Sequence, residues 1–173
     1  MTIRIEPLGK RHDRTTFTSG ESVLDRWFRT QAGQKERRSV TRVFVASDDE
    51  GIVGFSTLSM FAIGLDSVPE RVARKLPRYP DVPAALIGRL ARAIRARGKG
   101  VGELLVADAI DRIVAATRSI AAFAIVVDAK NERARLFYER LGFIPFPTRP
   151  DRLFLLMETA ASAAAKSRPP VSK

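Results

Sequence analysis

A glycine-rich stretch between a strand-like run and a helical pattern constrains this chain most. Residues 97–102 read Arg-Gly-Lys-Gly-Val-Gly; an apolar run from Ala84 to Ile94 precedes them, and a helical pattern begins at Val101. Glycine lets the backbone adopt positive φ and approach a ligand closely, and a helix start presents unpaired N–H groups. The stretch therefore indicates an α/β chain with either a phosphate or pyrophosphate site or a plain structural turn at this point.

Composition excludes several kinds of chemistry. The chain has 173 residues, of which 45% are hydrophobic, so it can bury the core of one domain. It contains no cysteine, which excludes disulfides, thiolate metal sites and cysteine nucleophiles. The only histidine is His12, near the N-terminus, and we interpret it as an ordinary loop residue. We therefore expect no metal site and no histidine-based catalytic triad.

The charge balance is strongly basic. Lys and Arg number 30 against 19 Asp and Glu, which gives a formal net charge of +11. The cations cluster at residues 35–42, 71–78 and 89–99. Such a balance favours a polyanionic partner such as nucleic acid, although a basic but otherwise ordinary solvated surface would have the same composition.

No segment has the pattern of a leader or a membrane span. Residues 1–10 lack an apolar core, and the longest uncharged run, Gly51 to Leu65, is too short to cross a bilayer. We expect a cytoplasmic protein with no membrane partner.

Hydrophobic periodicity predicts alternating helices and strands in one domain over residues 1–158, without internal repeats. Strands are expected at residues 3–5, 42–47, 52–60, 84–94, 121–127 and 152–157. Capping-box spacings at 18–21 and 67–70 predict two helix starts, and further helices are expected from Val101 and between Asn131 and Gly142. From Thr159 the chain is rich in Ala, Ser, Lys and Pro, and we expect a frayed tail over 159–173.

Two motifs in this order resemble the GNAT N-acetyltransferase superfamily. Arg97-x-x-Gly100-x-Gly102 is similar to its acetyl-CoA pyrophosphate motif, and Asn131-x-x-Ala134-x-x-x-Tyr138-x-x-x-Gly142-Phe143 is similar to its second signature. The resemblance implies the α/β (α+β) GNAT fold, a mixed and mostly antiparallel sheet with a splayed parallel strand pair, flanked by helices. It also implies acetyl-CoA as co-substrate, held by Leu90, Ala91, Arg92, Arg97, Gly98, Lys99, Gly100, Val101, Gly102, Asn131 and Tyr138.

A narrower resemblance covers most of the chain, from Phe17 to Leu156. It is similar to the GNAT toxins of type II toxin–antitoxin pairs in the segments Phe17-x-Ser19-Gly20, Arg37-Arg38, Leu76-Pro77-Arg78-Tyr79-Pro80, Gly88-Arg89-Leu90-Ala91, Val127-Asp128-Ala129-Lys130 and Arg152-Leu153-Phe154-Leu155. This resemblance implies acetylation of the α-amine of aminoacyl-tRNA, inhibition of translation, a ribbon-helix-helix antitoxin and a homodimer. One departure is Arg92-Ala93, where those toxins commonly have Val-Asp.

Acetyl transfer from a thioester to an amine needs a polarised carbonyl, a neutral amine and a proton for the leaving thiolate. Backbone N–H groups near Leu90 to Arg92 can polarise the carbonyl, and Tyr138 is the best candidate acid, although core packing also explains a tyrosine on the apolar face of its helix. Asn131 can cap that helix, and the resemblance also gives it a contact with the pantetheine arm. No general base is evident. An α-amine has a pKa of about 8, so part of it is already neutral at cellular pH and it can react without a general base.

Three functions remain open at this stage. The first is the tRNA-directed toxin. Its candidate tRNA contacts are Arg37, Arg38, Arg78, Arg89, Arg92 and Arg95. The second is a GNAT enzyme that acetylates a protein N-terminus or a small-molecule amine. The third is a catalytically silent basic RNA-binding module.

Overall fold

A computed structural model describes residues 2–76, 78 and 80–166 of the chain. Pro77 and Tyr79 of the expected proline-rich loop lie outside the described residues, as do residues 167–173. The chain divides into two compact units. Unit 1 comprises Met1–Ser59 and Ile87–Ala109, and unit 2 comprises Met60–Leu86 and Ile110–Lys173. Each unit is described by itself below.

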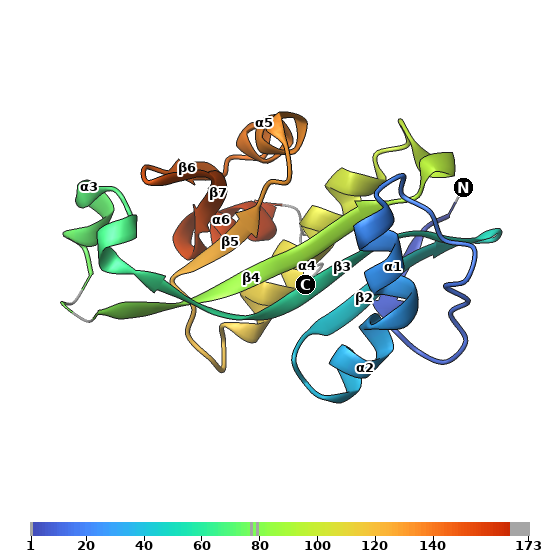
Figure 1. Cartoon of the computed structure of the whole chain (residues 1–173). Helices are drawn as coiled ribbons and strands as arrows, with labels where there is room; N and C mark the ends of the chain where they lie inside the picture. Colours follow the sequence, from blue (N-terminus) through green and yellow to red (C-terminus); the bar gives the residue numbers. More distant parts are fainter. Residues whose placement is uncertain (1, 77, 79, 167–173) are drawn as a thin grey trace. The chain divides into compact units, whose positions relative to one another are not determined.

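Seven strands form one mixed sheet in the order β1-β2-β3-β4-β5-β7-β6 (Figure 1). Their bounds are Arg4–Pro7, Arg42–Asp48, Gly51–Gly64, Asp81–Arg92, Ala124–Asp128, Ile144–Phe146 and Arg149–Leu156 for β1 to β7. β1–β2, β2–β3, β5–β7 and β6–β7 pair antiparallel, whereas β4 and β5 run parallel. This confirms the expected fold class.

In unit 1, helices pack on both faces of the β3 segment. On one face lie α1 (Ser22–Thr30) and α2 (Ala32–Arg37), where the ring of Phe28 stacks on Phe55 at 4.1 Å between centroids. On the other face, the position of a Cβ on Gly54 would lie 2.9 Å from Leu105 of α4 (Val101–Ala116). The same Cβ would lie 2.8 Å from the Ala91 carbonyl oxygen. Glycine at this position therefore allows β4 and α4 to approach β3 closely.

In unit 2, the antiparallel β5–β7–β6 arrangement supports three helices. They are α3 (Glu70–Ala73), α5 (Glu132–Arg140) and α6 (Met157–Lys166). The core of this unit includes Phe146 and Phe154, whose ring centroids are 5.0 Å apart, together with fully buried Val126. Because β5 is buried along Ala124–Val127, its side chains are almost all apolar, which is the pattern that predicted this strand.

Both predicted capping boxes are wrong. Thr18 and Ser19 do not cap α1; their hydroxyls donate to the buried carboxylate of Asp25, at 3.2 and 2.6 Å. The Ser67 hydroxyl likewise donates to the Gly64 carbonyl oxygen at 2.6 Å, at the end of the 3-10 turn η1 (Leu65–Ser67). In each case a short polar side chain finds another partner nearby, which competes with helix capping.

Residues 159–166 are helical in α6 rather than frayed. Alanine has the highest helix propensity, and Ala160 and Ala164 are buried on the same face, four residues apart. Element bounds also differ elsewhere: β4 ends at Arg92, before a 3-10 turn, η2 (Ile94–Ala96), and the short strand β6 was not predicted. Among the described residues, no helix is both long and apolar enough to cross a membrane.

Candidate functional site

The loop between β4 and α4, in unit 1, is open and glycine-dependent. Gly98 and Gly100 adopt φ of +77° and +72°, the left-handed region that side chains rarely occupy. A Cβ added at either glycine would meet no heavy atom within 4 Å, so solvent or a ligand can reach this backbone directly. Arg97 and Lys99 are exposed beside it. The first-turn N–H groups of α4 have no intrahelical partner, so the loop fits an anion such as a pyrophosphate.

The approach to this loop is held by contacts from distant parts of unit 1. The Ile94 amide donates to the Thr18 carbonyl oxygen at 2.9 Å. Thr18 in turn belongs to the turn held by Asp25, whose carboxylate also accepts the Ser19 amide at 2.9 Å. The buried Asp25 therefore positions Thr18, whose carbonyl oxygen accepts the first amide of η2.

Arg95 anchors the same region to the β2–β3 hairpin. Its guanidinium donates to both carboxylate oxygens of Asp48, at 2.8 and 2.7 Å. This contact lowers the pKa of Asp48 to about 2. Arg95 is a predicted tRNA contact, but its N–H groups are engaged by the hairpin turn.

The end of β4 presents two backbone N–H groups away from β3. The Arg89 amide donates to the Thr57 hydroxyl at 2.8 Å, and the Ala93 amide donates to the Val53 carbonyl oxygen at 2.8 Å. Because alternate residues of a strand point to opposite edges, the N–H groups of Leu90 and Arg92 point away from β3. These are two of the three β4 residues predicted to contact the acetyl group.

In unit 2, Tyr138 is fixed by the way in which α5 ends. The Phe143 amide donates to the Tyr138 carbonyl oxygen at 3.1 Å, and the Gly142 amide donates to that of Glu139 at 3.0 Å. With Gly142 at φ +98°, this is a Schellman motif. The ring of Phe143 packs edge-on against Tyr138 at 5.6 Å between centroids. The prediction that Gly142 ends the helix is confirmed.

The Tyr138 hydroxyl lies in an environment that keeps it protonated. Tyr138 is only 7% exposed, and burial together with the nearby Asp128 carboxylate raises its pKa to about 12. Asp128 is paired with Arg152, whose Nε and Nη2 donate to its two oxygens at 2.7 and 2.9 Å. The tyrosine is therefore available as a proton or hydrogen-bond donor at any physiological pH.

Asn131 caps α5, as predicted. Its side-chain oxygen accepts the Ala134 amide at 2.9 Å, and its own backbone is extended, with φ −160°. The side-chain NH₂ group is not used by this cap, and Asn131 is exposed. A hydrogen bond from Asn131 to a ligand is compatible with its capping role.

Comparison with known proteins decides the family. Residues 39–145 match the family described as "Acetyltransferase (GNAT) domain". The chain belongs to the GNAT acetyltransferase family. It is thus an acetyltransferase. One of the two sequence motifs lies at the start of α4 and the other along α5.

Two GNAT relatives are similar along nearly the whole chain. A tRNA-acetylating toxin from Mycobacterium tuberculosis is 39% identical over 148 residues, which are 86% of this chain and 88% of that protein. A structure of AtaT complexed with acetyl-methionyl-tRNAfMet has a TM-score of 0.86 at 27% identity and covers 94% of this chain and 99% of that one.

Two further AtaT structures show other ligands. A tyrosine-to-phenylalanine mutant of AtaT bound to the C-terminus of the antitoxin AtaR has a TM-score of 0.79 at 25% identity, with 93% of this chain and 97% of that one covered. AtaTR bound with AcCoA has a TM-score of 0.81 at 27% identity with the same coverage. Acetyl-CoA is therefore the co-substrate expected of this GNAT chain, and the open loop before α4 fits its pyrophosphate.

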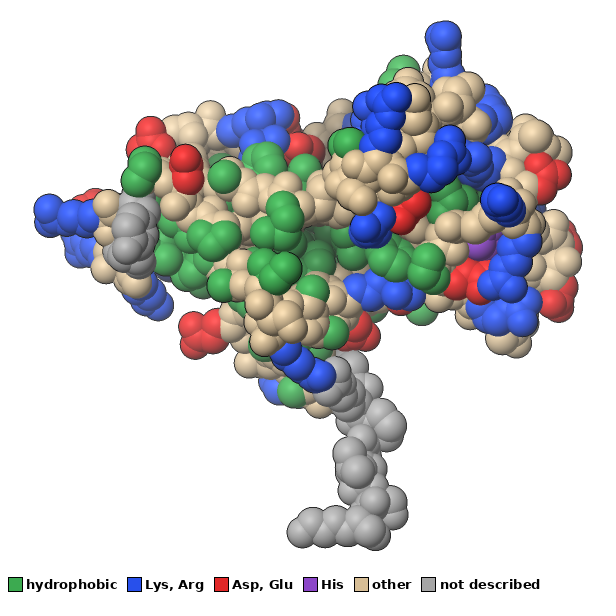
Figure 2. Space-filling model, turned by 90° about the horizontal axis from the view of Figure 1, so that it is seen from below, with side chains coloured by type: hydrophobic (Ala, Val, Ile, Leu, Met, Phe, Trp, Pro, Cys, Tyr) green, Lys and Arg blue, Asp and Glu red, His purple; other side chains and the backbone are tan. Residues whose placement is uncertain are grey.

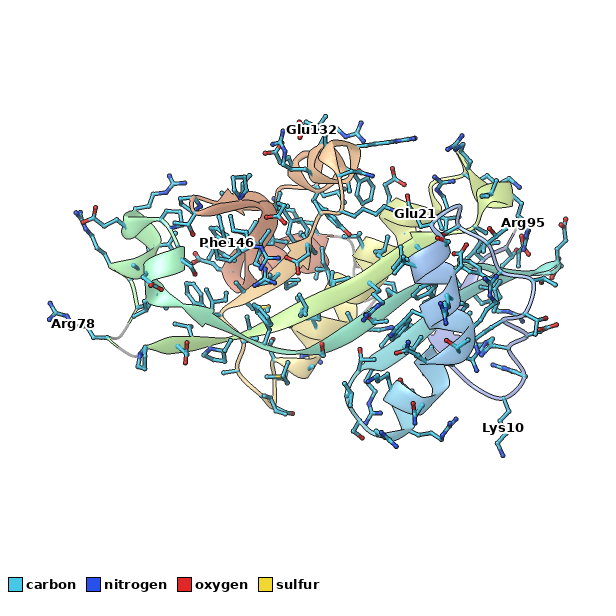
Figure 3. All side chains as sticks on the ribbon, viewed as in Figure 1. Lys10, Glu21, Arg78, Arg95, Glu132 and Phe146 are labelled. Atoms are coloured by element: carbon cyan, nitrogen blue, oxygen red, sulfur yellow. The ribbon has the colours of Figure 1, made fainter. Side chains whose placement is uncertain are left out.

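The predicted tRNA contacts are dispersed over the GNAT fold. Arg37 and Arg38 are exposed at the end of α2, and Arg92 is half-buried at the end of β4. The Arg89 guanidinium lies over the Trp27 ring, 4.2 Å from its centroid, and burial lowers the pKa of Arg89. Arg78 belongs to unit 2, where its side chain extends into solvent (Figure 3).

Sequence reasoning missed the charged groups that act on Tyr138 and on the segment before the β4–α4 loop. Asp128 and Arg152 lie within segments that match the toxins, but neither was assigned a role. Asp25 was not considered at all, although an acid among apolar positions of an amphipathic helix is a signal that it is bound from elsewhere. Among the described residues, no group of three or more His, Asp or Glu side chains is arranged to hold a metal ion.

Proposed function

We propose that this chain is a toxin that uses acetyl-CoA to acetylate the α-amine of aminoacyl-tRNA, and so inhibits translation. The observation that carries the proposal is its 39% identity, over 86% of its length, to a protein named for tRNA acetylation. The basic composition, with a net charge of +11, supports a nucleic-acid substrate. Residues 1–158 act as one catalytic domain in this proposal.

The donor is bound by the groups that the sequence motifs identify. Arg97, Lys99 and the backbone N–H groups of 98–102 hold the pyrophosphate, because cations and a helix start both favour negative charge. Asn131 donates its side-chain N–H to the pantetheine arm. Bound in this way, acetyl-CoA supplies an acetyl group activated as a thioester.

The β4 backbone and Tyr138 divide the chemical work between them. The N–H groups of Leu90 and Arg92 donate to the acetyl carbonyl oxygen and stabilise the negative charge that develops on it. As the neutral α-amine forms a bond to the acetyl carbon and the carbon–sulfur bond breaks, Tyr138 donates a hydrogen bond to the departing sulfur, and the proton that the amine gives up balances the thiolate that leaves. A thiol has a pKa of about 8.5, whereas that of Tyr138 is about 12, so the thiolate is too weak a base to take the tyrosine proton fully. The tyrosine thus acts first as a hydrogen-bond donor to the developing thiolate.

The acceptor is an α-amine rather than a lysine side chain. Its pKa is about 8, so a useful fraction is neutral without a general base, whereas a lysine amine has a pKa of about 10.4. No His or Cys is available to deprotonate such an amine, because the chain has no cysteine and His12 is held by Glu6 and Gly9. Arg37, Arg38, Arg78, Arg89 and Arg92 are the candidate contacts to the tRNA backbone.

The partners and setting follow from the toxin proposal. They are a cognate antitoxin of the ribbon-helix-helix type and a second copy of the chain in a homodimer, acting in the cytoplasm. The support is that AtaT, a protein of similar fold, binds the C-terminus of an antitoxin.

Transfer of labelled acetyl groups tests the proposal. The chain is incubated with [¹⁴C]acetyl-CoA and either charged tRNA, uncharged tRNA or a peptide with a free N-terminus. We expect label in the charged tRNA fraction only. Label in the peptide alone would replace the proposal with that of a protein or small-amine acetyltransferase, and absence of label in all three would leave a silent RNA-binding module.

A further inference from the structure

A pocket of about 580 Å³ lies in unit 1, and no residue of the loop between β4 and α4 lines it. We call it the N-terminal basic pocket; it is lined by Lys10, Arg11, His12, Asp13, Arg14, Thr15 and Arg29. Four of the seven residues are cations and one is an acid. Figure 2 shows Lys and Arg side chains gathered around the one histidine of the chain. None of these residues was among the predicted substrate contacts.

The cations of the N-terminal basic pocket are fixed in position by the fold. One N–H of Arg14 donates to the Phe28 carbonyl oxygen at 2.7 Å, and one of Arg29 donates to that of Phe17 at 2.9 Å. Each planar guanidinium has five N–H donors, so further donors remain on each after this bond. Fixing a cation before binding reduces the entropy that a ligand contact costs.

The loop that carries Lys10 and Arg11 is held by His12. The Gly9 amide donates to Nδ1 of His12 at 2.9 Å, so Nε2 carries the proton and donates to Glu6 at 2.9 Å. Glu6 also accepts from Arg11. The acid that lines the pocket, Asp13, is engaged by the amide and hydroxyl of Thr15, at 3.0 and 2.6 Å.

Arg37 extends the positive charge of the pocket. The position of a Cβ on Gly33 would lie 3.2 Å from Nη1 of Arg37 and 3.3 Å from Nη2 of Arg14, so the two guanidinium groups are neighbours. Burial and the charge of Arg37 lower the pKa of Arg14. Two like charges held together repel each other, and an anion between them relieves that cost.

We propose that the N-terminal basic pocket, with Arg37, binds backbone phosphates of RNA. The proposal rests on the proposed function, since it extends the surface that holds the tRNA acceptor. Phosphates are bound mainly by Arg and Lys, and the lining residues include no large apolar side chain. An acidic protein segment would need such side chains for its anchoring contacts, so RNA is the better occupant.

Salt-dependent binding of fluorescein-labelled, uncharged total tRNA tests this site. The variant is Lys10→Gln/Arg37→Gln, because both residues are exposed. The control is Arg118→Gln/Lys166→Gln, two exposed cations of unit 2 outside the three cation clusters, which changes the net charge equally. Affinity is measured by anisotropy from about 50 to 300 mM salt. The slope of log K against log salt is negative, and each lost phosphate contact reduces its magnitude by about 0.7–0.9.

We expect the pocket variant to reduce the magnitude of the slope by about 1.4–1.8 and the control to leave the slope nearly unchanged. Equal changes in the two variants would overturn the site. So would unchanged tRNA binding together with weaker binding of a labelled octaglutamate peptide, which would make the pocket a site for acidic protein. Because uncharged tRNA is not a substrate, a failure to acetylate charged tRNA would refute the proposed function without affecting this result.

Discussion

Arg152 of β7 and Asp128 of β5 lie opposite each other in the sheet and form a two-pronged ion pair, with N–O distances of 2.7 and 2.9 Å. The Arg152 guanidinium also lies over the Phe61 ring, 4.7 Å from its centroid. The same Asp128 carboxylate acts on Tyr138, where it adds to burial in raising the pKa. Arg152 therefore limits how strongly Asp128 holds the tyrosine in its protonated form.

Substituting Asp128 and substituting Arg152 should shift the pKa of Tyr138 in opposite directions. Asp128→Asn removes a negative charge and lowers the pKa from about 12, whereas Arg152→Gln leaves the charge of Asp128 unbalanced and raises it. The chain has two tyrosines, so absorbance at alkaline pH in a Tyr79→Phe background reports Tyr138 alone. Shifts in the same direction in both variants would show that Asp128 does not act on the tyrosine through its charge.

Loss of the Tyr138 hydroxyl should separate catalysis from binding. In Tyr138→Phe the ring contacts with Phe137 and Phe143, at 5.2 and 5.6 Å between centroids, are retained. We expect kcat to fall about 10²- to 10⁴-fold, the usual contribution of a positioned acid, with unchanged acetyl-CoA affinity and relief of growth arrest. The measurements are steady-state kinetics, calorimetry and growth after induction. A variant that remains equally active would exclude Tyr138 as the acid.

The raised pKa of Tyr138 also fixes the form of the pH–rate profile. Activity should rise through about pH 8 and level off near about pH 9, as an α-amine with a pKa of about 8 loses its proton. It should then stay level to about pH 10, because an acid with a pKa of about 12 keeps its proton there. Initial rates over short times limit hydrolysis of the aminoacyl ester. A decline between about pH 8.5 and 10 would indicate a tyrosine with an ordinary pKa near 10.

Local sequence signals predicted the helix ends that matter for the site. The Asn131 cap and the Gly142 end of α5 need only residues within the same helix and its flanks, and both are confirmed. The start of α4 at Val101 was predicted for the same reason. The fold class was expected from the resemblance of two such motifs, in this order, to those of the GNAT superfamily.

Contacts between distant segments could not be predicted. Arg95 was grouped with the tRNA-binding cations, but its partner Asp48 lies 47 residues earlier, in a hairpin turn. Thr18 and Glu21 have capping-box spacing, but the Ile94 amide donates to the Thr18 carbonyl oxygen, and the hydroxyls of Thr18 and Ser19 donate to Asp25. In both cases the hydrogen-bond partner is set by tertiary packing, and the local sequence does not distinguish it from other possible partners.

Glycine at position 54 should be required for stability in unit 1. In Gly54→Ala the new Cβ would lie 2.8 Å from the Ala91 carbonyl oxygen and 2.9 Å from Leu105, and the backbone cannot move aside cheaply. We expect a loss of about 1–3 kcal/mol in the free energy of unfolding, as for other overpacked sites. Urea denaturation measures it. Gly9→Ala is the control, because its nearest atom would be 4.0 Å away; equal stabilities of the two variants would contradict the close approach.

Comparing Gly98→Ala with Gly100→Ala should show which loop glycine faces the ligand. Both residues adopt similar positive φ, +77° and +72°, and neither has a heavy atom within 4 Å of the added Cβ. Each substitution should therefore cost about 1–2 kcal/mol of backbone strain. Both glycines lie in the segment proposed to hold the pyrophosphate, but only Gly100 occupies a glycine position of the motif Arg97-x-x-Gly100-x-Gly102. We therefore expect Gly100→Ala to weaken acetyl-CoA binding at least tenfold more than Gly98→Ala in calorimetry. Equal dissociation constants would mean that the loop glycines serve only the turn, and that the anion is held by Arg97, Lys99 and the first turn of α4.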